Sequence, residues 1–104
     1  KLTKDAKNIR GEIIEKTKAL GDYTRFDILE VLEERPYYVK ELAEKLGVSS
    51  ASLSHHLNLL FQVGFITANI EDRKTYYSIN KDAFRELGEK LISISKGGLK
   101  CVKI

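Results

Sequence analysis

A run of small, uncharged, hydrogen-bonding side chains occupies the middle of this 104-residue chain. The segment GVSSASLSHHLNLLF spans residues 47–61, and no Asp, Glu, Lys or Arg occurs between Leu46 and Ile70, although 32% of the chain is charged. Hydroxyl, amide and imidazole groups can hydrogen-bond to the edges of DNA bases, and a surface without carboxylates does not repel phosphate. The run therefore predicts a surface that reads the major groove. Burial of both sides of the segment in a partner interface is the alternative.

The leucines of this segment indicate that it is a helix. Leu53, Leu57 and Leu60 recur at helical spacing and form one apolar stripe. Ser49 is an expected N-cap, because its hydroxyl can accept an amide hydrogen of the first turn. The helix is predicted over about residues 50–63. Small or hydrogen-bonding residues form and flank its opposite stripe: Ser50, Ala51, Ser54, His55, Asn58 and Gln62.

A shorter helix and a glycine turn precede the expected reading helix. Apolar spacing predicts a helix over residues 39–46, and Gly47 follows at the position where a left-handed residue closes a helix. A helix, a short turn with glycine and a second helix make the helix-turn-helix layout. Upstream, Asp22 can cap another helix that runs to about Glu34. Its inward residues are expected to be Phe26, Leu29 and Leu32.

After the reading helix, apolar and polar side chains alternate with a period of two residues, as in a β-strand. Residues 65–70 and 74–79 alternate between apolar and polar side chains, and residues 71–73 read as the turn between them. A β-hairpin directly after a helix-turn-helix is a wing, and the tip of this one carries Arg73 and Lys74. These cations are candidate phosphate contacts. An ordinary edge hairpin with basic residues for solubility is the alternative.

Amphipathic segments at the two ends of the chain predict a first and a last helix, over about residues 1–20 and 81–95. Asn80 is the expected cap of the last helix, and Gly97 and Gly98 end it. Their apolar spacing suits packing on another helix, within the domain or from a second copy. The apolar residues concerned are Leu2, Ala6, Ile9, Ile13 and Leu20, and Phe84, Leu87, Leu91 and Ile94.

Together these segments predict a mostly α fold with a small β-hairpin wing, in the order α-α-α-α-β-β-α. We expect one winged helix-turn-helix domain over residues 1–95 and a C-terminal tail over 96–104. The net charge of +3 is compatible with binding to nucleic acid. The lone Cys101 excludes an intrachain disulfide and favours a reducing cytoplasm. No membrane segment is predicted. The chain has no Met and begins with Lys1, which suggests a fragment of a longer product.

Catalytic constellations are not apparent in the sequence. There is no phosphate-binding loop, no cluster of metal ligands, and no nucleophile with a paired base. Ser54 and His55 are adjacent on the predicted helix, so their side chains diverge. We therefore expect a protein that is not an enzyme and that has no cofactor.

Three stretches carry a resemblance to a known family. They are ALGDYTRFDILEVL at residues 19–32, KELAEKLGVSSASLSHHLNLLFQVGFI at 40–66, and TYYSI at 75–79. In combination they resemble the ArsR/SmtB family of bacterial winged-helix repressors. The resemblance implies a cytoplasmic, homodimeric transcriptional regulator, expected to be a repressor, that buries its first and last helices against the partner copy. It also implies double-stranded DNA with an inverted repeat as the target, and release on an unknown inducer.

The family pattern also suggests residue roles. It assigns base contacts to Ser50, Ala51, Ser54 and His55, with Ser52 and Asn58 as neighbouring candidates. Phosphate contacts are expected from the helix N-termini near Tyr38 and Ser49 and from the wing tip at residues 71–74. His56, nearer the apolar side, is expected to be a hydrogen-bonded residue at the edge of the core. The nine apolar residues of the end helices are the expected dimer interface.

The sequence departs from the metal-sensing members of that family. Their Cys-x-Cys pair matches Tyr38 and Lys40 here, and the last helix offers only the carboxylates Asp82, Glu86 and Glu89. Carboxylates without His or Cys make a poor transition-metal site, so no metal site is expected. Two other functions remain open at this point. They are a winged helix that binds a partner protein, and a DNA-binding fragment of a longer regulator.

Overall fold

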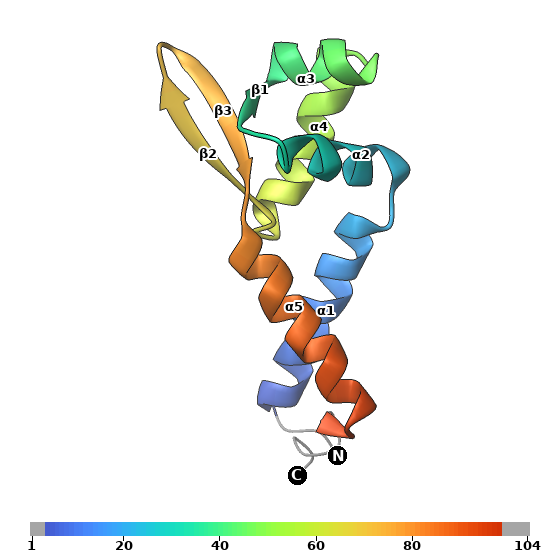
Figure 1. Cartoon of the computed structure of the whole chain (residues 1–104). Coiled ribbons are helices and arrows are strands. Elements are labelled where there is room, and N and C mark those ends of the chain that lie inside the picture. The colour runs from blue at the N-terminus through green and yellow to red at the C-terminus, as the bar shows by residue number, and fades with distance from the viewer. Residues whose placement is uncertain (1–3, 99–104) are drawn as a thin grey trace.

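The computed structural model describes residues 4–98 of the chain, with side chains from residue 9 onward. It consists of five helices and three strands within that range: α1 (Lys4–Leu20), α2 (Tyr23–Leu32), β1 (Tyr37–Tyr38), α3 (Val39–Leu46), α4 (Ser50–Gln62), β2 (Ile66–Glu71), β3 (Lys74–Ile79) and α5 (Lys81–Ser95). The molecule is elongated, 50 × 25 × 21 Å. Figure 1 shows α2, α3, α4 and the sheet gathered into a head, from which α1 and α5 extend as two legs.

Helix α4 supplies the centre of the core. Leu53, Leu57 and Leu60 are all 0% exposed, as the apolar stripe predicted. The other side chains that are essentially fully buried come from α2, α3 and the start of β2: Ile28, Leu42, Phe65 and Ile66. Because one side of α4 is enclosed by these elements, its opposite side must face outward.

The predicted order of elements lacked one strand. Tyr37 and Tyr38 form β1, which pairs antiparallel with Tyr77 and Tyr76 of β3. The sheet therefore has three strands in the order β1-β3-β2. A strand of two residues is too short to show an alternating pattern, so periodicity could not reveal it. The mostly helical fold with a β-hairpin wing is confirmed.

Helix α2 differs from its prediction at two points. It ends at Leu32 rather than near Glu34, and Glu33 is its C-cap. Phe26 was predicted to point inward, which is wrong: its side chain is 56% exposed. The buried face instead consists of Ile28, Leu29, Val31 and Leu32. These four residues fill the side of α2 that faces the core, and Phe26 lies outside it. The N-cap is as predicted, because the Asp22 carboxylate accepts a hydrogen bond from the amide of Arg25 at 3.0 Å.

Asn80 joins the head to the second leg. It is the N-cap residue of α5, but its side chain makes no capping bond to that helix. Its Nδ2 instead donates to the carbonyl of Gly64 at 2.9 Å, and its backbone amide donates to the carbonyl of Phe65 at 2.8 Å. The start of α5 is thus tied to the turn that follows α4, where Gly64 has the left-handed φ of 86°.

The Phe65→Ala variant tests this junction. Phe65 is 0% exposed and its ring stacks on that of Phe84, with centroids 4.4 Å apart. Truncation leaves a cavity and should lower the free energy of unfolding by about 3–5 kcal/mol in urea denaturation. Phe61→Ala is the matched control, because that ring is 49% exposed; its cost should be about 1 kcal/mol or less. Equal losses in the two variants would contradict this packing.

Candidate nucleic-acid interface

The outward side of α4 carries every candidate base-contacting residue. The side chains of these six residues are all exposed: Ser50, Ala51, Ser52, Ser54, His55 and Asn58. Ser49 caps the helix as predicted, because its Oγ accepts a hydrogen bond from the amide of Ser52 at 3.1 Å. The first turn has no acidic residue. A helix N-terminus without a carboxylate favours the approach of an anion such as phosphate.

The turn between α3 and α4 holds this face in place. Gly47 adopts the left-handed conformation, with φ 67° and ψ 33°. Its amide donates to the carbonyl of Ala43 at 2.9 Å, and the amide of Val48 donates to the same carbonyl at 3.2 Å. Because a residue with a Cβ is disfavoured in that conformation, glycine suits the position. The predicted bounds of α3 are confirmed, and together α3, the turn and α4 form a helix-turn-helix.

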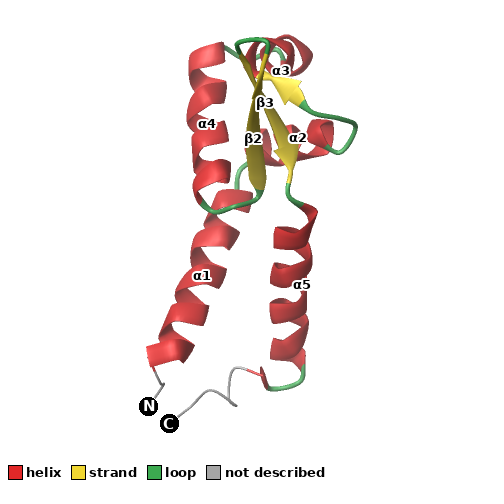
Figure 2. Cartoon of the chain, turned by 90° about the vertical axis from the view of Figure 1, so that its left-hand side faces the viewer, coloured by secondary structure: helices red, strands yellow, loops and turns green. Residues whose placement is uncertain are grey.

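The wing tip is tighter than the sequence suggested. Glu71 belongs to β2 and pairs with Lys74, so only Asp72 and Arg73 form the turn. Both have positive φ, 50° and 64°, as the hairpin-favouring two-residue turn requires. Arg73 and Lys74 are exposed there. Figures 1 and 2 both show the wing tip at the same end of the molecule as the start of α4, away from the far ends of the two legs.

Aromatic rings attach the wing to α3. The Lys74 ammonium lies over the ring of Tyr38, 4.8 Å from its centroid. That ring in turn meets Tyr76 of β3 edge-on, with centroids 5.5 Å apart. Lys74 is thus held beside the helix-turn-helix by a cation–π contact, whereas Arg73 extends from the turn itself.

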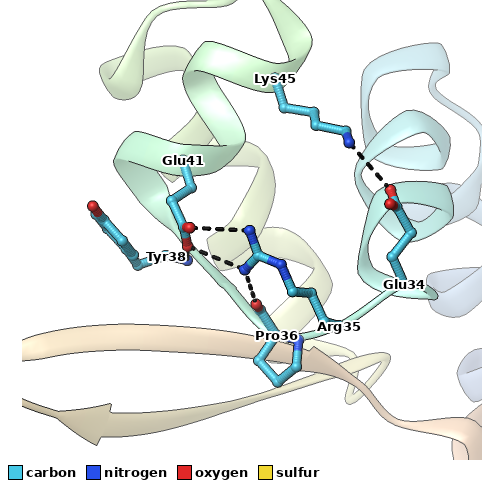
Figure 3. Close-up of polar contacts among 6 residues, drawn as sticks. All are labelled: Glu34, Arg35, Pro36, Tyr38, Glu41 and Lys45. Carbon is cyan, nitrogen blue, oxygen red and sulfur yellow. Dashed lines mark hydrogen bonds and ion pairs between the residues drawn. The ribbon is translucent and has the colours of Figure 1, made fainter.

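A carboxylate occupies the start of α3. Glu41 accepts a hydrogen bond from the backbone amide of Tyr38 at 3.2 Å and two from Arg35, at 3.1 and 3.4 Å (Figure 3). The Arg35 guanidinium also donates to the carbonyl of Pro36 at 2.7 Å. Because Glu41 already binds the Tyr38 amide, that amide is not available to the phosphate predicted near this helix end. The N-terminus of α4, by contrast, has no such acidic partner in its first turn.

The expected dimer residues divide into two groups. Leu87 is only 4% exposed within one protomer, and Ile13, Leu20 and Phe84 are partly buried against its core. Farther along α5, Leu91 and Ile94 are 47% and 40% exposed. Sequence reasoning missed two exposed residues on the same legs, Ile14 at 53% and Ile92 at 58%, because it followed a single stripe on each helix. Leu2 and the side chain of Ala6 lie outside the described part of the structure.

Metal-binding and membrane-spanning features are absent from residues 4–98. No three His, Cys, Asp or Glu side chains of that part of the chain converge to hold a metal ion. None of its helices is both long and apolar enough to cross a bilayer. Cys101 lies outside the described residues.

The class of protein follows from the helix-turn-helix, its exposed neutral helix face and the three-stranded wing: this is a winged helix-turn-helix domain. A family model for bacterial regulatory proteins of the arsR family matches residues 22–68. The transcriptional repressor SdpR of Bacillus subtilis is 35% identical over 81 residues, which cover 77% of this chain and 90% of that protein. The chain therefore belongs to the ArsR family, and it is a DNA-binding transcriptional regulator.

Solved structures agree with this fold. An ArsR-like transcriptional regulator from Rhodococcus has a TM-score of 0.82 and 26% identity, covering 86% of this chain and 85% of that one. The homodimeric winged helix-turn-helix DNA-binding domain of a Mycobacterium bovis protein, fragment 1–100, has a TM-score of 0.76 and 22% identity, covering 91% and 89%. At that identity the second likeness concerns the fold.

The ion pair at the start of α3 should make stability depend on pH. The hydrogen bond from Arg35, and then that from the Tyr38 amide, lower the pKa of Glu41 below its ordinary value of 4.5. A pKa lowered in the folded state contributes stability above the ordinary value and loses it as pH falls through the lowered value. In thermal unfolding between pH 6 and roughly pH 3, Glu41→Gln should therefore lose less stability on acidification than the wild type. Arg35→Gln, which removes the main cause, should flatten the profile too; wild-type profiles in both variants would contradict this assignment.

Proposed function

We propose that this chain represses transcription as a homodimer bound to an inverted repeat in double-stranded DNA. The observation that carries the proposal is the outward face of α4, whose side chains are exposed, uncharged and mostly able to hydrogen-bond. The start of α4 lies at the same end of the molecule as the tip between β2 and β3 (Figure 1), and Arg73 and Lys74 of that tip are exposed. A neutral helix face suits base edges, and cations beside it suit the phosphates that flank a groove.

In this proposal α4 enters the major groove and the wing tip meets the backbone or the minor groove. Each serine hydroxyl can donate or accept, so Ser50 and Ser54 would discriminate weakly between bases. The methyl group of Ala51 can contact a thymine methyl. His55 is the most informative residue, because its imidazole can donate to a guanine N7 or, when charged, contact phosphate. Ser49, Ser52 and Asn58 border this group.

The legs support the homodimer. Exposed apolar residues lie on both α1 and α5: Ile14, Leu91, Ile92 and Ile94. The legs are joined to each other by the ion pair between Lys90 and Glu12 at 2.8 Å. Residues of this kind would be covered if the legs of a second copy packed against them. The M. bovis domain of similar fold is homodimeric. Two α4 helices related by a two-fold axis would then read half-sites about one helical turn apart, roughly 34 Å.

We also infer that an unknown inducer releases the chain from its DNA. DNA binding is consistent with a cytoplasmic location. The alternative of a protein-binding winged helix would call for apolar residues on the outward stripe of α4, where Ser54, His55 and Asn58 are found instead.

Selection from randomised DNA tests the proposal. The purified chain is incubated with a pool of randomised duplexes, the retained duplexes are sequenced, and the mass of the chain in solution is measured alongside. A dimeric mass and an enriched inverted repeat are the expected results. A folded dimer that enriches no sequence would reject sequence-specific binding and favour the protein-interaction alternative. Enrichment by a monomer would reject the homodimer.

The variant His55→Ala tests the reading face. Loss of a base-edge contact should cost about 1–3 kcal/mol at the selected site, which is roughly a 5- to 150-fold weaker Kd by titration. Gln62→Ala is the matched control, because Gln62 is exposed on the same helix but is its last residue, beyond all the candidate base contacts. Unchanged specific binding by a correctly folded His55→Ala dimer would show that this residue is not a reader.

A further inference from the structure

One guanidinium joins the leg α1 to the helices α2 and α4 of the head. Arg25 belongs to α2, and its Nε donates to the carbonyl of Ala19 at 2.6 Å while its Nη2 donates to that of Lys18 at 3.4 Å. These carbonyls lie in the last turn of α1, where backbone oxygens lack partners within the helix and a cation is favourable. The Nη1 of the same group lies 3.0 Å from Nδ1 of His56, in the middle of α4.

The imidazole of His56 must accept this hydrogen bond. A guanidinium has only donors, so Nδ1 carries the lone pair and the ring hydrogen resides on Nε2. The His56 side chain is 17% exposed, in contrast to that of the exposed His55 beside it. Successive residues on a helix point about 100° apart, so the two histidines serve different sides of α4. The predicted hydrogen-bonded residue at the edge of the core is confirmed, but its partner was not foreseen.

Asp22 completes the cluster. Its Oδ2 lies 3.7 Å from Nδ1 of His56, a contact without a hydrogen bond because both atoms are acceptors, and the same oxygen accepts the backbone amide hydrogen of Arg25 at 3.0 Å. That hydrogen bond lowers the pKa of Asp22, which keeps the carboxylate ionised beside the guanidinium. The end of α1, the start of α2 and the middle of α4 are therefore held together by charge-assisted hydrogen bonds.

We propose that Arg25 and His56 are positioning residues that set the spacing at which a dimer reads its two half-sites. This inference rests on the proposed function. Helix α1 is a leg of the proposed dimer, and α4 carries the reading face. In a two-fold symmetric dimer, a change in the angle between α1 and α4 occurs in both copies. It therefore alters the separation of the two reading helices. His56 points into the protomer rather than toward DNA, so it acts through the orientation of α4 and not through base contact.

Duplexes of varied geometry test this role. The half-site obtained by selection is placed once in one duplex, and twice in a series whose centre-to-centre separation changes by one base pair at a time. The wild type should prefer one separation sharply. Two variants break the contact: His56→Leu removes the acceptor, and Arg25→Lys keeps the positive charge but lacks the several N–H donors of the guanidinium. Both should bind the single half-site like the wild type. The wild type should bind the two-site duplex of best separation more tightly than the single half-site by a certain factor. In the variants this factor should fall by roughly 2- to 30-fold, as for residues that couple sites without touching a ligand.

Two further variants separate positioning from structural damage. His56→Asn restores an acceptor near the place of Nδ1, so it should recover the wild-type spacing profile. His55→Ala is the matched control, because losing a base contact should weaken binding at every separation equally. Thermal unfolding and solution mass identify the folded dimers among the variants, and Arg25→Lys carries the test if His56→Leu does not fold.

The outcomes distinguish this inference from the proposed function. The positioning role is overturned if the folded variants show the wild-type dependence of binding on half-site separation. It is also overturned if His56→Asn fails to recover that dependence. Neither result contradicts DNA binding. A wild-type chain that binds no duplex overturns the proposed function, and the positioning role with it.

Discussion

The burial of one side of α4 is the constraint on which the rest of the structure depends. Leu53, Leu57 and Leu60 are fully enclosed by α2, α3 and the sheet. Complete burial of leucine side chains stabilises a fold by about 1.5–3 kcal/mol each relative to leaving them in water. Rotation of the helix would expose them, so its polar side cannot turn inward. The same helix therefore fixes the core and presents the reading face, and the rigidity of that face derives from the core.

Two carboxylates near that face are engaged in local hydrogen bonds. Glu41 is bound by Arg35 at the start of α3, and Asp22 lies beside Arg25 at the start of α2. Each acid caps a helix by accepting a backbone amide hydrogen, from Tyr38 for Glu41 and from Arg25 for Asp22, and Glu41 also forms an ion pair with Arg35. The uncharged run from Leu46 to Ile70 is followed at the wing by Glu71 and Asp72 and then by the cations Arg73 and Lys74. This division suits a helix that must approach a polyanion closely.

The parts of the fold that could be predicted from sequence were those with a repeating pattern or a local cap. The stripe of α4, the bounds of α3, the Ser49 cap and the exposed candidates all follow from spacing within one element. What could not be predicted depends on contacts between distant segments. β1 exists only because β3 lies beside it, and Asn80 bonds to Gly64 rather than to its own helix. The pairing of Arg25 with His56 spans 31 residues and leaves no periodic signal.

At the wing tip, the residue that the backbone conformation favours differs from the residue that supplies positive charge. Asp72 and Arg73 both occupy a region of conformational space that glycine enters readily and other residues enter at a cost. A search for stabilising substitutions would choose glycine at the second position, since Asp-Gly is a favoured sequence for such a turn. That choice would also remove the outermost cation of the wing. Consensus or stability-guided engineering of this domain would therefore select against the phosphate contact proposed for Arg73, which makes the turn one to hold constant in redesign.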